Sequence, residues 1–288
     1  MPALLALVVV TAVWGVTFVQ VKDAVAIYPV LAFLALRFGI ASLTLAPAGR
    51  RVRGLGRSGV GAAALAGALL GLGYVLQTLG LQRTSVSSAG FITGMYVVLT
   101  PVIAFVLFRL RVAAAAWAGV ALATVGLAML AGVHGGSVSG ELLVLAAAAV
   151  YSLQIVLMER YAPRYDPLGF TLVEMLVAFG GLAVAAIPVF AVPRGATVWG
   201  ALLVTGVFAS ALAFLVQTWA QRRTSATRTA LVFTLEPVWA AIFGFTLAGD
   251  RLGALGWGGC AVIMAGIVLA EPAAASTLAR LVRRPRPA

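Results

Sequence analysis

Residues 75–84, VLQTLGLQRT, recur in near-copy at residues 215–224 as LVQTWAQRRT, so a Gln-Thr pair and an Arg-Thr pair return after 140 positions. The chain has 288 residues, so this separation is close to half its length. In a chain this apolar, such a repeat indicates that the fold is built from two copies of one unit. Two membrane units that face each other can form a pathway with a site between them, which is a common plan for secondary transporters.

The composition predicts a membrane protein. Hydrophobic residues make up 62% of the chain and charged residues 10%, with a mean hydropathy of +1.09, whereas a soluble domain has roughly 25% charged residues. His134 and Cys260 are the only histidine and cysteine. They therefore allow no intrachain disulfide and no His/Cys metal cage. We expect no metal and no cofactor, and the absence of a GxxxxGK[ST] motif argues against direct use of ATP.

Ten apolar runs are long enough to cross a bilayer, which takes roughly 20 residues per helix. The first run lacks the basic start of a cleaved signal peptide, so we expect it to be retained. The ten expected spans are 3–21, 29–48, 59–80, 86–108, 113–133, 139–159, 168–189, 197–218, 226–248 and 252–271.

The basic residues are unevenly distributed between the loops. Fifteen of the twenty follow even-numbered spans, four follow odd-numbered spans, and Arg37 lies inside the second span. Because Lys and Arg accumulate in cytoplasmic loops, this asymmetry predicts that both termini are cytoplasmic in a bacterial inner membrane. It also accounts for the net charge of +12 without a nucleic-acid partner.

The repeat extends beyond its best-matching segment. Trp117 corresponds to Trp257 after 140 positions, and Pro101 to Pro237 after 136. Leu/Ala/Val-rich segments can align by chance, but chance does not explain shared polar pairs, a mid-helix proline and a tryptophan in register. Each half contains five spans, and an odd number makes the second half enter the membrane from the opposite side, as an inverted repeat.

We therefore expect one all-α integral membrane domain over residues 1–288. Its first repeat is residues 1–137, its second is residues 138–272, and residues 273–288 form a basic cytoplasmic tail.

Several motifs occur in an order that resembles one family. They are AVWGVTFVQVKDA, YPVLAFLALRFGIASL, LQTLGLQRTSVSSAGFITGMYVVLTPVIAFVLF and EPVWAAIFGFTLAGDRLGALGWGG. Together they resemble the EamA-type members of the drug/metabolite transporter superfamily over nearly the whole chain. The resemblance implies a ten-helix exporter or exchanger of small metabolites, with a cavity lined by helices 1, 3, 4, 6, 8 and 9. Among its members, the chain resembles the aromatic amino-acid exporters.

Charged residues at membrane depth need a partner or a function. Arg37 and Glu174 lie at nearly matching places in spans 2 and 7. Arg37 could attract an anionic group and Glu174 could carry a proton, or each could anchor helix packing. We favour packing, because these two spans are expected at the periphery.

Glu236 immediately precedes Pro237 in span 9. A proline disturbs the preceding turn and frees a backbone carbonyl, so Pro237 and its counterpart Pro101 are candidate kink sites. A broken helix beside a carboxylate can form a substrate or proton site, and the alternative is a buried Glu that stabilises the kink. The residues leave both interpretations open.

Gln77 and Gln217 correspond across the repeat, late in spans 3 and 8. They could contact substrate from opposite sides, or form hydrogen bonds between helices. We favour cavity lining, and extend this with less support to Gln154 in span 6.

Other candidate wall residues lie on the same set of helices. Thr93, Tyr96 and Thr100 share one helical face. The aromatic candidates could stack on a flat substrate or simply pack in the core; they are Trp14, Phe91, Tyr96, Tyr151 and Trp239.

We interpret the chain as a secondary transporter, most simply an exporter of amino acids or related compounds by alternating access. Its expected partners are a small-molecule substrate, lipid and, where coupling occurs, protons; no oligomer is required. A passive facilitator can share this fold and is the main alternative. A membrane enzyme is disfavoured because no cluster of catalytic residues is apparent.

Overall fold

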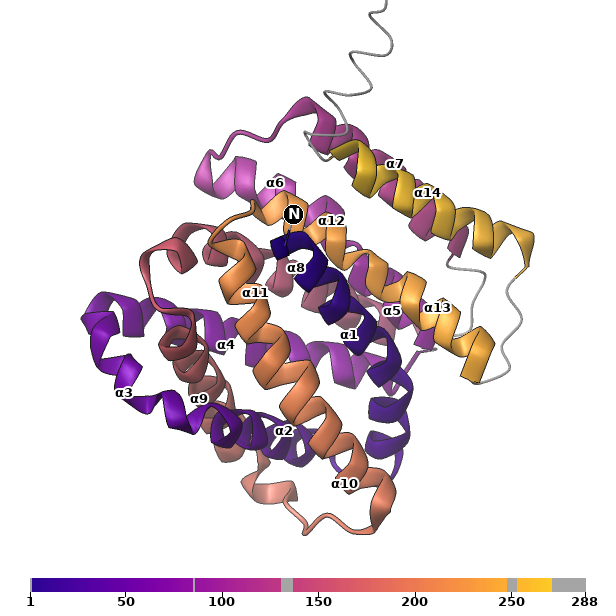
Figure 1. Ribbon diagram of the computed structural model, residues 1–288. Coiled ribbons are helices and arrows are strands. Elements are labelled where there is room, and N and C mark those ends of the chain that lie inside the picture. Colours follow the sequence, from indigo (N-terminus) through magenta and orange to yellow (C-terminus); the bar gives the residue numbers. More distant parts are fainter. Residues whose placement is uncertain (1, 85, 131–136, 248–252, 271–288) are drawn as a thin grey trace, which may run out of the picture.

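The computed structural model describes residues 2–84, 86–130, 137–247 and 253–270, and the regular secondary structure in these ranges is helical (Figure 1). The first half contains α1 (Pro2–Ile27), α2 (Val30–Leu45), α3 (Gly49–Val52), α4 (Gly56–Leu81), α5 (Val86–Gly94), α6 (Tyr96–Phe108) and α7 (Ala114–Leu130). The second half contains α8 (Val138–Tyr161), α9 (Pro167–Ala186), α10 (Gly195–Leu203), a π-helical segment (Val204–Leu212), α11 (Ala213–Gln221), α12 (Ala226–Phe233), α13 (Leu235–Leu247) and α14 (Ala254–Ala270).

Each expected span coincides with one helix or with consecutive helices. Span 4 corresponds to α5 and α6, span 8 to α10 through α11, and span 9 to α12 and α13. Short 3₁₀ turns continue α2, α3, α8 and α9 at Ala46–Ala48, Arg53–Leu55, Ala162–Arg164 and Ile187–Val189. The expected basic tail, residues 273–288, lies outside the described residues.

Within the described ranges, six helical stretches are long and apolar enough to cross a membrane. They are Pro2–Ile27, Val30–Leu81, Ala89–Phe108, Val138–Arg164, Pro167–Val189 and Gly195–Gln221. The stretch Val30–Leu81 includes both α2 and α4. The apolar helices near the ends of the two halves, Ala114–Met129 and Ala254–Leu269, are shorter. The chain therefore has the helices of a multi-pass membrane protein, while ten crossings stay a prediction.

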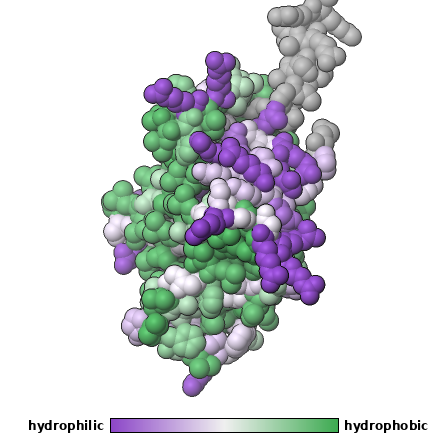
Figure 2. Space-filling model, turned by 90° about the vertical axis from the view of Figure 1, so that its left-hand side faces the viewer, coloured by the Kyte–Doolittle hydropathy of each residue, from purple (hydrophilic) through white to green (hydrophobic). Residues whose placement is uncertain are grey.

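The surface agrees with a lipid environment. Hydrophobic residues cover much of the face in Figure 2, and hydrophilic residues gather along one side of it. Large apolar side chains such as Leu5, Phe105 and Ile187 are 62% to 73% exposed. Contiguous apolar surface of this kind is unfavourable in water and favourable in a bilayer.

When each helix is replaced by its counterpart in the other half, the main helix contacts map onto one another. α2 packs on its counterpart α9, and α7 packs on its counterpart α14, which lie side by side in Figure 1. The contact of α4 with α8 is matched by that of α1 with α11. The contact of α6 with α8 is matched by that of α1 with α13. Two halves related by a two-fold axis would produce this exchange.

Glycines allow the closest helix crossings. A Cβ on Gly126 of α7 would lie 2.7 Å from the carbonyl oxygen of Gly259, and one on Gly266 of α14 would lie 2.8 Å from that of Gly119. Small residues let backbones approach in this way. The two glycines also correspond across the repeat after 140 positions.

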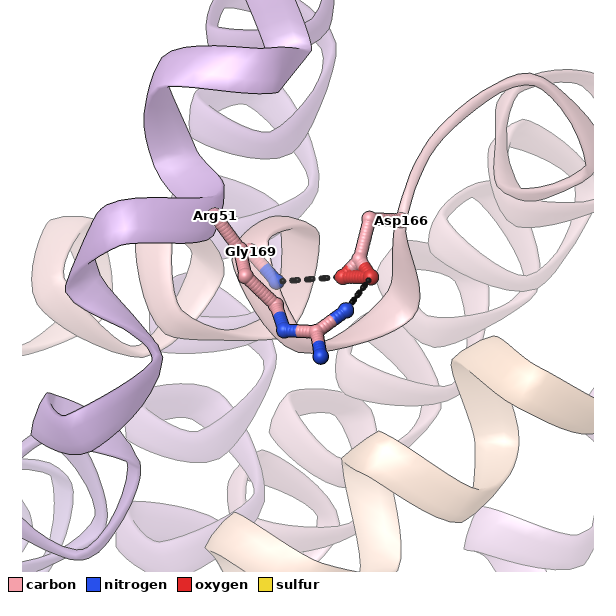
Figure 3. A network of polar contacts seen from close by, with 3 residues as sticks. All are labelled: Arg51, Asp166 and Gly169. Carbon is pink, nitrogen blue, oxygen red and sulfur yellow. Dashed lines mark hydrogen bonds and ion pairs between the residues drawn. The ribbon is translucent and has the colours of Figure 1, made fainter.

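The start of α9 is stabilised by a small polar cluster (Figure 3). Asp166 precedes α9 and accepts a hydrogen bond from the Gly169 backbone N–H at 3.4 Å, while Arg51 donates to its other oxygen at 3.0 Å. The Arg51 side chain is 59% exposed, so this ion pair contributes little stability. Its effect is to join the segment after α2 to the start of α9.

Replacing Gly67 with alanine is expected to destabilise the protein. The new Cβ would lie 2.3 Å from the backbone oxygen of Glu174, so α4 and α9 would have to separate, at a typical overpacking cost of about 1–3 kcal/mol. Thermal unfolding in detergent measures the effect. Gly61→Ala on the same helix is the matched control, because its Cβ would meet nothing within 4 Å and alanine favours helix. Equal melting temperatures for the two variants would contradict the close crossing.

Candidate substrate site

Two adjoining cavities lie between the halves. The first, here the Arg37 cavity, has a volume of about 360 Å³ and the second, the Tyr151 cavity, about 420 Å³, in both cases counting space that opens to solvent. Both are lined by Trp14, Tyr74, Gln77 and Glu236. Their walls come from α1, α4, α5, α6, α8, α11, α12 and α13, and α2 contributes only Arg37.

Aromatic rings form much of the wall. The Trp14 ring lies 4.9 Å from that of Phe233 and 5.5 Å from that of Phe214, and Tyr74 lies 5.6 Å from Tyr151. These ring pairs meet at tilted or edge-on angles, the arrangement that aromatic quadrupoles favour. The cavities therefore offer apolar ring surfaces beside a small number of polar groups.

Arg37 is only 3% exposed and reaches the cavity from α2. Its Nε donates to the Ser210 hydroxyl at 2.7 Å and its Nη2 to the Tyr74 hydroxyl at 3.1 Å. The guanidinium carbon also lies 4.3 Å from the centre of the Tyr74 ring. Helix packing and a place in the cavity wall are thus combined in one side chain. The packing role that we favoured is therefore present, and α2 reaches the cavity through this long side chain alone.

The π-helical segment Val204–Leu212 supplies acceptors for this arginine. The Ala209 carbonyl accepts a hydrogen bond from Trp14 Nε1 at 2.9 Å and a longer one from Arg37 Nη2 at 3.4 Å. A π-helical segment departs from the i→i−4 bonding of an α-helix and often marks a functional site. Its Ala209 carbonyl therefore helps to hold two side chains of the cavity wall, Trp14 and Arg37.

Glu236 lies where span 9 is interrupted. α12 ends at Phe233 and α13 begins at Leu235, four and two residues before Pro237. Glu236 Oε2 accepts a 3.4 Å hydrogen bond from the Tyr96 hydroxyl. The one ion pair among the described residues joins Arg51 and Asp166, so Arg37 and Glu236 line the same cavity without being paired to each other.

Gln77 lies in the wall of both cavities and also joins three helices. Its Nε2 donates to the Thr93 hydroxyl of α5 at 3.1 Å, and its Oε1 accepts from the Tyr151 hydroxyl of α8 at 3.1 Å. Gln77 therefore both lines the cavities and forms hydrogen bonds between helices.

Gln217, its counterpart, begins a chain of buried polar groups. Gln217 Nε2 donates to Gln154 Oε1 at 3.0 Å, and Gln154 Nε2 donates to Glu174 Oε1 at 2.8 Å. Gln217 and Gln154 line the Tyr151 cavity, whereas the fully buried Glu174 lies behind that wall. Its Oε2 has no hydrogen-bond partner.

Eight of the ten candidate binding residues thus line the cavities. They are Trp14, Gln77, Thr93, Tyr96, Tyr151, Gln154, Gln217 and Glu236. Phe91 instead packs in an apolar cluster with Val97 and Val120, and Trp239 packs against Phe243 at 6.0 Å.

The candidate kink at Pro101 differs from the one at Pro237. α6 continues through Pro101, and the interruption between α5 and α6 falls at Met95, six residues earlier. Thr100, which corresponds to Glu236 after 136 positions, is fully buried. The first half therefore has a hydroxyl where the second half has a carboxyl group.

Three aromatic residues in the wall of the Tyr151 cavity were absent from our sequence-based candidates: Tyr74, Phe214 and Phe233. Tyr74 and Phe214 each lie three residues before a candidate glutamine and therefore on the same helical face. They also correspond across the repeat after 140 positions. Both could have been identified in the sequence as residues on the same helical face as the two glutamines.

The sequence profile of the EamA-like transporter family matches this chain twice, over residues 1–132 and 138–270. The chain belongs to the EamA-like transporter family. This confirms the family that the motif order indicated, and it makes the protein a multi-pass membrane transporter.

Other similarities agree with this membership. An uncharacterized transporter of Archaeoglobus fulgidus is 30% identical to this EamA-like chain over 268 residues, covering 92% of this chain and 84% of the relative. A solved structure, described as "Crystal structure of protein", aligns with a TM-score of 0.77 at 20% identity, covering 98% of this chain and 99% of that one. The second similarity shows the fold alone.

Proposed function

We propose that this EamA-like protein is a secondary transporter that exports amino acids, or closely related zwitterionic metabolites with an apolar side chain, by alternating access. Its ten helices form two inverted halves around the two cavities. The chain spans the inner membrane, and both termini lie on its cytoplasmic side.

The observation that carries the substrate class is the presence of a basic and an acidic side chain in one cavity. Arg37 and Glu236 both line the Arg37 cavity and are not paired with each other. An amino acid presents a carboxylate and an ammonium group, which complement a guanidinium and a carboxylate respectively. The adjoining rings of Trp14, Phe214 and Phe233 would take an apolar or aromatic side chain.

The inverted arrangement is supported by the helix contacts that the repeat exchanges, since a two-fold axis between the halves would produce them. Proton coupling is supported by the carboxyl group of Glu236 at the junction of the two cavities, because such a group can take up and release a proton during the cycle.

Counterflow in proteoliposomes tests this function. We expect labelled phenylalanine to enter vesicles preloaded with unlabelled phenylalanine, with saturation, because a carrier exchanges one substrate per conformational cycle. Phenylalanine methyl ester and phenethylamine, which lack the carboxylate, should compete poorly. Flux without saturation or counterflow would favour a passive facilitator, and no flux of any amino acid would overturn the substrate class.

A further inference from the structure

The two cavities extend toward two matched hydrogen-bond clusters at the helix ends. In the first, the Lys22 latch, Lys22 Nζ donates to the Thr84 carbonyl at 3.1 Å and Gln82 Nε2 donates to the Val25 carbonyl at 2.9 Å. This cluster joins the end of α1 to the segment that follows α4.

The second cluster, the Glu159 latch, lies in the other half and likewise combines a charged side chain with a glutamine. Glu159 Oε2 accepts from the Ala226 backbone N–H at 2.8 Å, and Gln221 Nε2 donates to the Ile155 carbonyl at 2.8 Å. It joins the end of α8 to the end of α11 and the start of α12.

The repeat relates these clusters to each other. Lys22 and Glu159 are separated by 137 positions, the same offset that relates Trp14 to Tyr151. In each latch a charged side chain of α1 or α8 binds a backbone group that follows α4 or α11. A glutamine at the end of α4 or α11 donates to a backbone carbonyl of α1 or α8. The charged residue is a cation in one half and an anion in the other.

Each latch lies at the end of a different cavity. Val21 and Leu81 line the Arg37 cavity and are adjacent in sequence to Lys22 and Gln82. In the Tyr151 cavity, Ile155 is itself a wall residue, and Gln217 donates to Gln221 at 2.9 Å.

The helices that the latches join have few other contacts with each other. α4 packs mainly on α8 and α9, and α1 mainly on α11 and α13, so α1 is not a main packing partner of α4. α8 and α11 also share few contacts, although α8 packs in addition on α12. Hydrogen bonds therefore provide part of the connection at these two places.

We propose that the Lys22 latch and the Glu159 latch are the two gates of the transport path, each closing one cavity. This rests on the proposed alternating access. In the present structure both latches are formed, which corresponds to a state with both ends closed. Opening one end breaks one latch while the other holds.

Two further groups fit this assignment. The hydroxyls of Thr84 and Thr224 are buried without hydrogen-bond partners, and these threonines correspond after 140 positions, one beside each latch. An unsatisfied buried hydroxyl is unfavourable. Exposure of either threonine to water on opening would remove this penalty.

Single thiols placed in the cavities test the gates without any substrate. Because Cys260 is the only cysteine, Cys260→Ala provides a thiol-free background. Val21→Cys places a thiol in the Arg37 cavity and Leu70→Cys places one in the Tyr151 cavity. The rate of modification by a charged, water-soluble methanethiosulfonate is measured in detergent, where the reagent reaches both ends.

Adding Lys22→Met should raise the modification rate of the Val21→Cys thiol about tenfold, the effect expected for one lost hydrogen bond to a charged group. The rate at the Leu70→Cys thiol should fall. Glu159→Met should produce the opposite pattern. Gln82→Leu, at an exposed position, should act in the same direction as Lys22→Met.

Controls separate the hydrogen bonds from charge and from general loosening. Lys22→Arg keeps the donor and Glu159→Gln keeps an acceptor, so both should stay near the parent rates. Asp23→Asn changes the neighbouring exposed charge and should have no effect. Unchanged rates in both latch variants, or equal increases at both thiols, would overturn the assignment. A failed phenylalanine assay would not alter these rates, so the substrate class and the gates can fail separately.

Discussion

Replacing Arg37 with glutamine is expected to weaken the binding of an amino acid by about 10- to 100-fold, since hydrogen bonds to charged groups contribute about 1.5–3 kcal/mol and each 1.4 kcal/mol is tenfold. The loss should be large because, among the described residues that line the Arg37 cavity, Arg37 alone carries a positive charge for a carboxylate. Saturation of counterflow at increasing phenylalanine concentration measures the effect.

A substrate analogue separates recognition from structural damage. Arg37 also binds Ser210 and Tyr74, so its loss could disturb the wall itself. Phenethylamine has no carboxylate, and its weak competition should be nearly the same in the wild type and in Arg37→Gln. If both ligands lost affinity equally, the variant would have disrupted packing, and Arg37 would have no part in recognising the carboxylate. Arg37→Lys should recover part of the affinity, because it keeps the charge but not the forked geometry.

Replacing Glu236 with glutamine is expected to abolish the stimulation of transport by a pH gradient. The amide has nearly the same shape and can still accept a hydrogen bond from Tyr96 at the site of the present 3.4 Å contact, but it cannot carry a proton. Counterflow at equal pH on both sides should persist, because exchange requires no net proton movement. The measurement is uptake with and without an imposed gradient.

Two neighbouring substitutions serve as controls for Glu236. Glu174→Gln changes the other fully buried carboxyl group, which does not line either cavity, and should leave the gradient response unchanged. Tyr96→Phe removes the hydroxyl that binds Glu236 but leaves the carboxyl group. An unaltered gradient response in Glu236→Gln would end the coupling assignment.

The sequence was most informative where one pattern repeated. The Gln-Thr and Arg-Thr pairs at residues 77–84 and 217–224 identified two copies, and motif order identified the family that the profile match confirms. The apolar runs located the helices, because about 20 apolar residues are needed to cross a bilayer whatever the packing between helices. These properties depend on residues close together in the chain.

The site was only partly predictable for the same reason. Gln77, Gln217 and Glu236 were found because polar groups are conspicuous in an apolar helix. Phe91 and Trp239 were chosen as aromatic residues on helices expected to line the path, but Phe91 packs in a separate apolar cluster and Trp239 stacks on Phe243 of its own helix. Which way an apolar ring points depends on helix rotation, and the sequence pattern of a helix that is apolar all round does not reveal it.

The sequence by itself determined that the chain is a membrane protein made of two similar halves, because hydropathy and repetition are properties of the chain. Only the tertiary structure decided that Arg37 shares a cavity with Glu236, that the π-helical segment presents the Ala209 carbonyl, and that Lys22 and Glu159 form matched latches. Each of these joins residues at least 57 positions apart. Contacts over such separations depend on how the helices cross and rotate, and close packing between helices sets both.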